Sequence, residues 1–142
     1  MNFKNRLMNI AIAGGVMSLC SLLATPAFAS SKDDGKAHIE FARTVHDFGT
    51  IKEDGGPVSC DFEFENTGSK NLVIIDARAE CGCTRPVFPE KPVAPGKKSK
   101  ISVTYHPLGR PGGFDKVVTV KTNGKPGKVR LRIRGTVMPK GK

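Results

Sequence analysis

The sequence contains no tryptophan, a single tyrosine and no apolar residues that recur at helical spacing. Because single-stranded nucleic acids stack their bases on aromatic side chains, this scarcity argues against a nucleic-acid partner. The chain also lacks a nucleophile elbow, a glycine-rich phosphate loop after a strand, and paired carboxylates in an evident cleft. We therefore predict a protein that is not an enzyme and that carries no cofactor.

The first 29 residues are typical of a secretory signal peptide. Lys4 and Arg6 precede an apolar run, which ends in the small-residue sequence Ala27-Phe28-Ala29. Asn, Gly and Ser residues interrupt this run, and it is shorter than the roughly 20 apolar residues that a membrane span requires. The sequence thus predicts a signal peptide at residues 1–29, no transmembrane span in the remaining chain, and a periplasmic or secreted location.

The 113 residues that follow position 29 of 142 are enough for one compact domain and too few for two. We predict a flexible N-terminal segment at residues 30–37, a single domain at 38–137 and a basic tail at 138–142. Charge is spread unevenly: residues 97–142 carry a net charge of +12, and residues 30–96 a net charge of −4. A basic half of this kind favours an anionic partner.

Apolar and polar residues alternate along most of the chain, as they do in strands with one buried face. The alternation is clearest in residues 58–65, 101–106 and 129–137, where every second residue is apolar except for a glycine at position 135. The continuous apolar run at 72–75 predicts a strand that is covered on both faces. Turns rich in Gly, Pro and Asn separate about seven such strands, which predicts an all-β, antiparallel β-sandwich.

Several motifs follow one another in a specific order: VHDFGTI, FEFENTG, LVI, CGCT, PVAPGKKSKISVTYHP, GRPGGFDKVVTVKTN and LRIRGTV. In this order the chain closely resembles the bacterial domain of unknown function 1573, an immunoglobulin-like family akin to the Hydin and major-sperm-protein modules. The resemblance covers residues 38–137 and implies an immunoglobulin-like sandwich in an exported protein, with no assigned activity. Cys60 lies outside the family's pattern, so the resemblance gives that thiol no role.

The CGCT motif places Cys81 and Cys83 one residue apart, so that a strand would present both sulfurs on the same side. An oxidising compartment would allow these two thiols to form a disulfide with each other, or one of them to pair with Cys60. Alternatively, the two thiolates could bind a soft metal, with His46 or His106 adding a nitrogen ligand. A closed zinc site takes four donors, which this spacing does not supply.

The segment that follows CGCT is rich in proline, with Pro86, Pro89, Pro92 and Pro95. Proline withholds backbone donors, so we predict an extended segment that is not paired in a sheet. Long ordered connections are often functional, and a partner could dock on Arg85, Val87 and Phe88. The alternative is a strand that switches sheets while Val87 and Phe88 cover the core.

The last alternating segment carries a basic stripe, Lys128, Arg130, Arg132 and Arg134, on its polar face. Lys116 or Lys121 is predicted to lie beside this stripe on the neighbouring strand. The stripe is either a solvated face or an anion-binding surface for acidic proteins or phosphate-bearing envelope lipids, since arginine grips carboxylate and phosphate in pairs of hydrogen bonds.

These observations predict an exported, non-enzymatic binding module with a protein partner in the cell envelope. The surfaces considered are the edge strands, the proline segment and the basic face. The candidate partner-binding residues are Arg85, Phe88, Arg130, Arg132 and Arg134. The alternative function is a thiol-dependent role, either redox or soft-metal binding, centred on CGCT.

Overall fold

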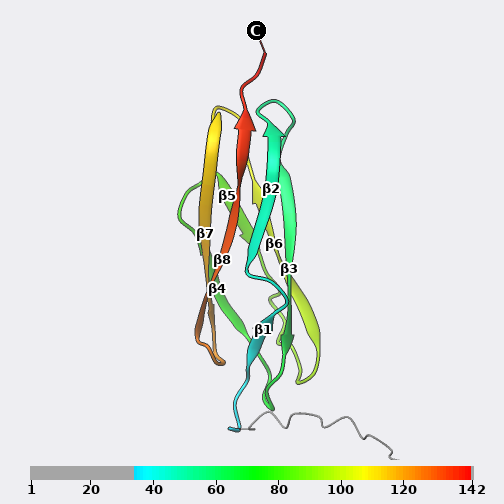
Figure 1. The fold of residues 1–142 in the computed structure, drawn as a ribbon. Coiled ribbons are helices and arrows are strands. Elements are labelled where there is room, and N and C mark those ends of the chain that lie inside the picture. Colours follow the sequence, from blue (N-terminus) through cyan, green and yellow to red (C-terminus); the bar gives the residue numbers. More distant parts are fainter. Residues whose placement is uncertain (1–33, 142) are drawn as a thin grey trace, which may run out of the picture.

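The structure, a computed structural model, describes residues 34–141 as eight β-strands, with no helix in that range (Figure 1). The strands are β1 (Ile39–Phe41), β2 (Val45–Lys52), β3 (Val58–Asn66), β4 (Ile74–Ala79), β5 (Thr84–Val87), β6 (Lys98–Tyr105), β7 (Gly112–Thr122) and β8 (Lys128–Met138). The all-β prediction is confirmed. The predicted signal peptide lies outside the described residues, among which no helix has the length and apolar character needed to cross a membrane.

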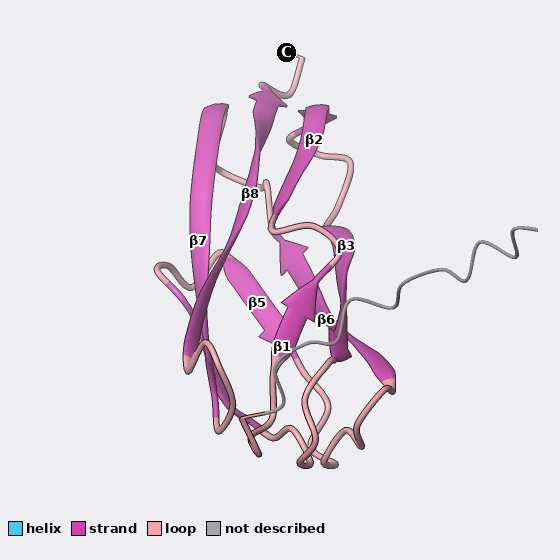
Figure 2. Cartoon of the chain, turned by 60° about the horizontal axis from the view of Figure 1, so that its bottom comes forward, coloured by secondary structure: helices cyan, strands magenta, loops and turns pink. Residues whose placement is uncertain are grey.

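Two four-stranded sheets form the sandwich (Figure 2). One has the strand order β1-β3-β6-β5 and the other β2-β8-β7-β4, and the inward faces of both share one hydrophobic core. All neighbouring strands are antiparallel except β2 and β8, which pair in parallel. The first two strands are consecutive in the chain but belong to different sheets, so the chain crosses the sandwich at residues 42–44.

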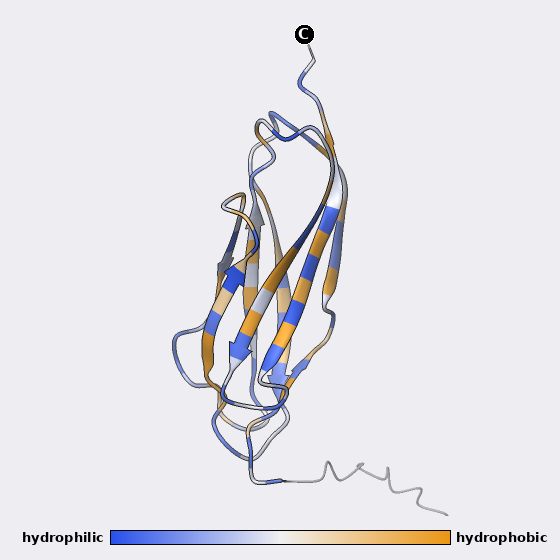
Figure 3. Ribbon diagram, turned by 90° about the vertical axis from the view of Figure 1, so that its left-hand side faces the viewer, coloured by the Kyte–Doolittle hydropathy of each residue, from blue (hydrophilic) through white to orange (hydrophobic). Residues whose placement is uncertain are grey.

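The core consists of the apolar residues that the alternation predicted to face inward. Figure 3 shows the alternation as bands of opposite hydropathy along the strands. Fully buried side chains come from three strands in particular: Phe62 and Phe64 of β3, Ile101 and Val103 of β6, and Leu131 and Ile133 of β8. At one end, the ring of Tyr105 stacks on Phe114, with centroids 4.0 Å apart. Burying this apolar surface provides the main driving force for folding.

Two local predictions fail at the edges of the sheets. The run at 72–75 is not a strand covered on both faces: Ile74 is buried, but the next residue, Ile75, points away from the core and is 60% exposed. The register of β4 against β7 also shifts between Ile74 and Asp76. The bulge turns one extra residue away from the core. The proline segment was predicted to be unpaired, but it contains a strand, β5, in which Pro86 pairs in register with Val103. An edge strand tolerates proline because one of its sides has no ladder partner.

Asn66, at the end of β3, organises the end of the sandwich where the described chain begins. Its side chain is fully buried, and its oxygen accepts hydrogen bonds from the backbone N–H groups of His38 and Gly68, at 3.3 and 3.0 Å. Its amide nitrogen donates to the carbonyl oxygens of Lys70 and Val93, both at 2.8 Å. All four hydrogen-bonding positions of the amide are therefore occupied.

The chain just before β1 packs against the sandwich at residues 34–37, the described part of the predicted flexible segment; residues 30–33 of that segment lie outside the described residues. Ala37 is buried in the core, and its carbonyl oxygen accepts a hydrogen bond from the Lys125 N–H at 2.9 Å. A Cβ atom on Gly68 would overlap the backbone of residues 36–38, so only glycine allows this close approach. At the other end, β8 continues to Met138, and the Lys140 N–H donates to Glu53 at 2.9 Å.

Candidate functional site

The predicted basic stripe lies on the outer face of the sheet β2-β8-β7-β4. Its members all point to solvent from β8, and two of them are neutralised by acids on neighbouring strands. Arg134 pairs with Asp47 of β2, with Nε 2.9 Å from Oδ2, and Arg132 pairs with Asp115 of β7 at 3.3 Å. The Gly49 N–H, and then Arg134, hold the pKa of Asp47 below its usual value. Half of the stripe is thus occupied by the protein's own carboxylates.

The other half of the stripe has no such partners. Lys128 pairs in register with Lys121 of β7, and Arg130 is the next outward residue of β8. Within residues 34–141, none of these three side chains forms an ion pair with an acid. We call Lys121, Lys128 and Arg130 the basic patch. Lys116 does not join it, because that residue pairs with the buried Ile133 and so has the inward parity of β7.

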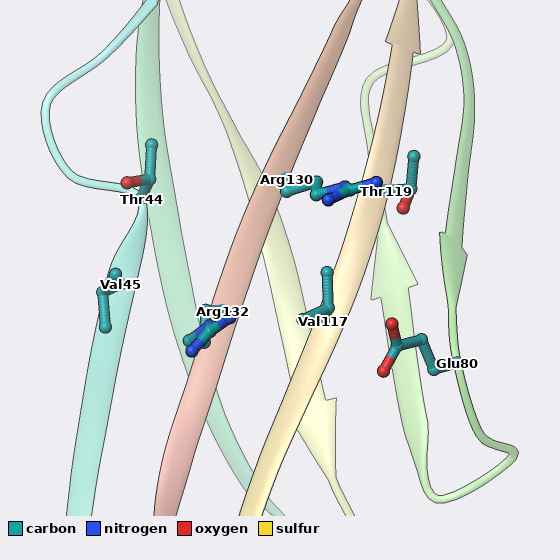
Figure 4. A pocket seen from close by; sticks show the side chains of 7 residues that line it. All are labelled: Thr44, Val45, Glu80, Val117, Thr119, Arg130 and Arg132. Carbon is teal, nitrogen blue, oxygen red and sulfur yellow. The ribbon is translucent and has the colours of Figure 1, made fainter.

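A pocket of about 420 Å³ adjoins the basic patch on the same face. Figure 4 shows Arg130 reaching across β7 towards Thr119, and Glu80 extending towards Val117 from the opposite side. The pocket is lined by Thr44, Val45, Glu80, Val117, Thr119, Arg130 and Arg132. It combines two guanidinium groups with the apolar surface of Val45, which is 46% exposed, and of Val117. The sequence did not single out Val45, Val117 or Glu80, because their approach depends on pairings between distant strands.

The CGCT motif lies where the chain passes from β4 in one sheet to β5 in the other. Cys81 and Cys83 are joined by a disulfide, with their Cα atoms 5.3 Å apart. Cys83 belongs to the buried core, whereas Cys81 is half-buried and packs against the edge of the core. The hydroxyl oxygen of Thr84 lies 3.7 Å from each of the two sulfurs.

Cys60 remains a free thiol, so the alternative in which it pairs with a cysteine of CGCT does not hold. It faces inward from β3 opposite Val103 of β6, and its side chain is buried in the core. Burial raises the pKa of its thiol to about 11, because the low-dielectric interior disfavours the thiolate. Cys60 is therefore an unreactive core residue.

The two histidines considered as metal ligands belong to different sheets, His46 to β2 and His106 to the residues just after β6. His46 has the inward parity of β2 and contacts the ring of Phe48 edge-on, with centroids 4.5 Å apart, and burial lowers its pKa. His106 is exposed just after β6, and its backbone N–H donates to the Cys83 carbonyl at 2.9 Å. Residues 34–141 contain no group of three or more His, Cys, Asp or Glu placed to hold a metal ion.

The proline segment combines features of both predicted alternatives. It begins just after the crossing between the sheets, as β5, and joins β5 to β6 within one sheet; Phe88 packs against the core as the sheet-switching alternative requires. Arg85 and Val87 instead point outward from β5, and Val87 is 60% exposed. A docking surface on this segment would therefore consist of Arg85 and Val87 without Phe88.

Comparison with solved structures places the fold among immunoglobulin-like domains. A protein of unknown function from Porphyromonas gingivalis W83 superposes with a TM-score of 0.63 at 14% identity, over 78% of this chain and 51% of that one. The ASH/PapD-like domain 7 of human CEP192 superposes with a TM-score of 0.58 at 19% identity, over 89% and 100%. The secreted serine protease VesC from Vibrio cholerae gives 0.53 at 12% identity, over 73% and 24%.

The chain thus spans about half of the Porphyromonas protein and about a quarter of VesC, and these likenesses establish the fold alone. No curated protein matches the sequence. The family described as "Protein of unknown function (DUF1573)" matches residues 39–137, which include every strand from β1 to β7 and nearly all of β8. The resemblance carried by HDFG, NTG, CGCT and the final G-x-V motif is confirmed, and the chain belongs to the DUF1573 family.

Proposed function

We propose that the protein is an exported, non-enzymatic binding module that captures an extended acidic segment of an envelope protein. The segment binds on the outer face of the sheet β2-β8-β7-β4, along the basic patch and into the adjoining pocket. The observation that carries this proposal is that Lys121, Lys128 and Arg130 lie together and form no ion pair within residues 34–141, although Arg132 and Arg134 beside them are both paired. Asp76, which lies opposite Lys121 on β4, pairs instead with Arg78.

The lining of the pocket determines which side chains of the bound segment fit at each side of the pocket. Arg130 and Arg132 lie on one side and Glu80 on the other, so an acidic side chain fits beside β8 and is repelled near β4. Val45 and Val117 flank Arg132 on its two sides and offer apolar contact to small aliphatic side chains of the segment. A segment lying here also runs close to β2, an edge strand whose outer side has no ladder partner in its sheet.

Export is supported by the basic start, apolar run and small-residue ending of residues 1–29. The disulfide in CGCT adds support, because such bonds form and persist mainly in oxidising compartments. We expect N-terminal sequencing of the protein from the envelope fraction of the producing cell to begin at Ser30. Recovery of the intact Met1 terminus from the cytoplasmic fraction would contradict export.

Reversal of two charges in the basic patch, Lys128→Glu with Arg130→Glu, is expected to weaken binding of a poly-glutamate peptide roughly tenfold or more. Neither side chain forms an ion pair with an acid in the described chain, so the change breaks no internal salt bridge. Isothermal titration measures the affinity, and chemical-shift changes in NMR spectra locate the peptide. We expect the shifts at Val45, Val117 and Arg130, and a weaker affinity at higher salt.

The matched control is Lys91→Glu with Lys97→Glu, which changes the net charge equally on the exposed connection between β5 and β6. This variant should keep most of the affinity. Equal losses in both variants would mean that the peptide responds only to net charge, and the proposed site would be wrong. Vesicles of phosphatidylglycerol and phosphatidylcholine test the other anionic source. If the protein binds vesicles more tightly than the peptide, and the charge reversal in the basic patch abolishes this binding, the partner is a lipid surface and the proposed protein partner is wrong.

A further inference from the structure

The disulfide in CGCT closes a very small loop at a crossing that other bonds already hold. The Glu80 N–H donates to the Val117 carbonyl at 3.2 Å, and the His106 N–H to the Cys83 carbonyl at 2.9 Å. The Thr84 N–H also donates to the Cys81 carbonyl at 3.3 Å. Because the entropy that a disulfide removes from the unfolded chain grows with loop length, a pair separated by one residue contributes little of it. A role as a structural staple therefore does not account for this bond.

The two sulfurs differ in their access to solvent. Cys83 is only 3% exposed and lies within the core, whereas Cys81 is half-buried at the edge of the core. An external thiolate must approach one sulfur and expel the other, so access decides which sulfur is attacked. The geometry makes Cys81 the sulfur that is attacked and Cys83 the leaving group.

A polar group that could stabilise the leaving sulfur is already in place. The side chain of Thr84 is buried, and within the described chain its hydroxyl contacts only the two disulfide sulfurs, each at 3.7 Å. A buried hydroxyl is normally satisfied by an oxygen or nitrogen partner. When Cys83 departs as a thiolate, the same hydroxyl can donate a charge-assisted hydrogen bond to it.

We propose that Cys81 and Cys83 form a thiol–disulfide exchange site that accepts two electrons from an external thiol or dithiol. A donor thiolate attacks the Cys81 sulfur, which breaks the bond to Cys83 and forms a mixed disulfide, while the Cys83 thiolate takes up a proton. A second donor thiolate then attacks the donor sulfur of the mixed disulfide and releases Cys81, which is protonated in turn. The donor leaves as its disulfide, and the protein gains two electrons and two protons.

Glutathione provides the test, with the full-length protein incubated in buffers of graded reduced-to-oxidised ratio. Free thiols are alkylated after an acid quench and located by peptide mapping with mass spectrometry. We expect Cys81 and Cys83 to pass together from disulfide to dithiol within this series, while circular dichroism still shows a folded sheet protein. Cys60 should stay unmodified, since it is buried in the core. A pair that stays oxidised throughout the series would overturn the proposal.

Single-cysteine variants test the assignment of the two sulfurs. In Cys83→Ser, oxidised glutathione should modify Cys81, whereas in Cys81→Ser the buried Cys83 should remain free. The reverse pattern would overturn the assignment.

Thr84→Val should slow reduction by glutathione about tenfold, because it removes the hydrogen bond to the departing thiolate. Thr84→Ser, which keeps a hydroxyl, should restore the rate. Equal rates in the Val and Ser variants would show that the hydroxyl has no part in exchange. Thr84→Val lies outside the basic patch and its pocket and should leave binding of the poly-glutamate peptide unchanged, so failure of the binding proposal is separable from failure of this one.

Discussion

Asn66→Asp should cost about 3 kcal/mol or more of the free energy of unfolding at neutral pH. The substitution keeps the shape of the side chain but replaces its NH₂ group, which donates to the Lys70 and Val93 carbonyls, with a carboxylate oxygen. Oxygen then faces oxygen, and because position 66 is fully buried the charge is removed from bulk solvent. Such a loss is a large part of the roughly 5–15 kcal/mol that stabilises a typical domain. Urea denaturation followed by circular dichroism measures it.

Asn123→Asp is the matched control, because Asn123 makes the same kinds of bond on the surface. Its oxygen accepts from the Val73 N–H at 2.8 Å, and its amide donates to the Asn71 carbonyl at 3.1 Å. Water can replace the lost donor at this exposed position, so we expect a cost below about 1 kcal/mol. Equal costs for the two variants would show that burial of the Asn66 side chain and its four hydrogen bonds does not determine the loss of stability.

Gly135→Ala should destabilise the sandwich by about 1–3 kcal/mol, the range typical of overpacking a core. A Cβ atom at this position would lie 2.8 Å from the Gly49 carbonyl oxygen and 2.9 Å from two carbon atoms of the Phe114 ring. Phe114 cannot easily yield, since it is stacked on Tyr105, and Gly49 lies in the register shift of β2. Because Gly135 has no side chain, Gly49 of β2 and the ring of Phe114 can both lie close to β8. Thermal and urea unfolding both report the change.

Gly113→Ala tests whether this cost comes from packing. Gly113 lies on the neighbouring strand, pairs with Thr136, and has open space where a Cβ atom would be placed. Alanine there should be neutral or slightly stabilising, because it restricts the unfolded chain more than glycine does. A loss at Gly113 similar to that at Gly135 would indicate a general need for glycine in this part of the sheet.

Sequence periodicity predicted the sandwich wherever strands are long and regular. In β8, Leu131 and Ile133 are buried while Arg130 and Arg132 point outward, as the alternation requires. The alternation is interrupted by the bulge between Ile74 and Asp76, since one extra residue reverses the faces of the residues that follow. It also fails for Pro86, because a sequence does not state whether a strand will lie at the edge of its sheet.

The candidate sites were less predictable because they depend on contacts between distant segments. The basic stripe was evident in the sequence, but its division into paired and unpaired halves depends on Asp47 and Asp115 lying beside Arg134 and Arg132. The sequence places Asn66 in the FEFENTG motif, but it does not show that the four hydrogen-bond partners of this side chain extend from His38 to Val93. No local pattern reports such partners, which lie 28 and 27 residues away.

The parallel pairing of β2 with β8 also determines when this chain can fold. β8 is an interior strand of its sheet, and it is the last of the eight described strands to be synthesised. Until it emerges, β2 has no neighbour in its sheet and the core lacks Leu131, Ile133 and Val137. Topologies dominated by such distant pairings acquire their native contacts late. The core therefore stays incomplete until β8 has been synthesised, about 75 residues after β2, the strand with which it pairs in parallel.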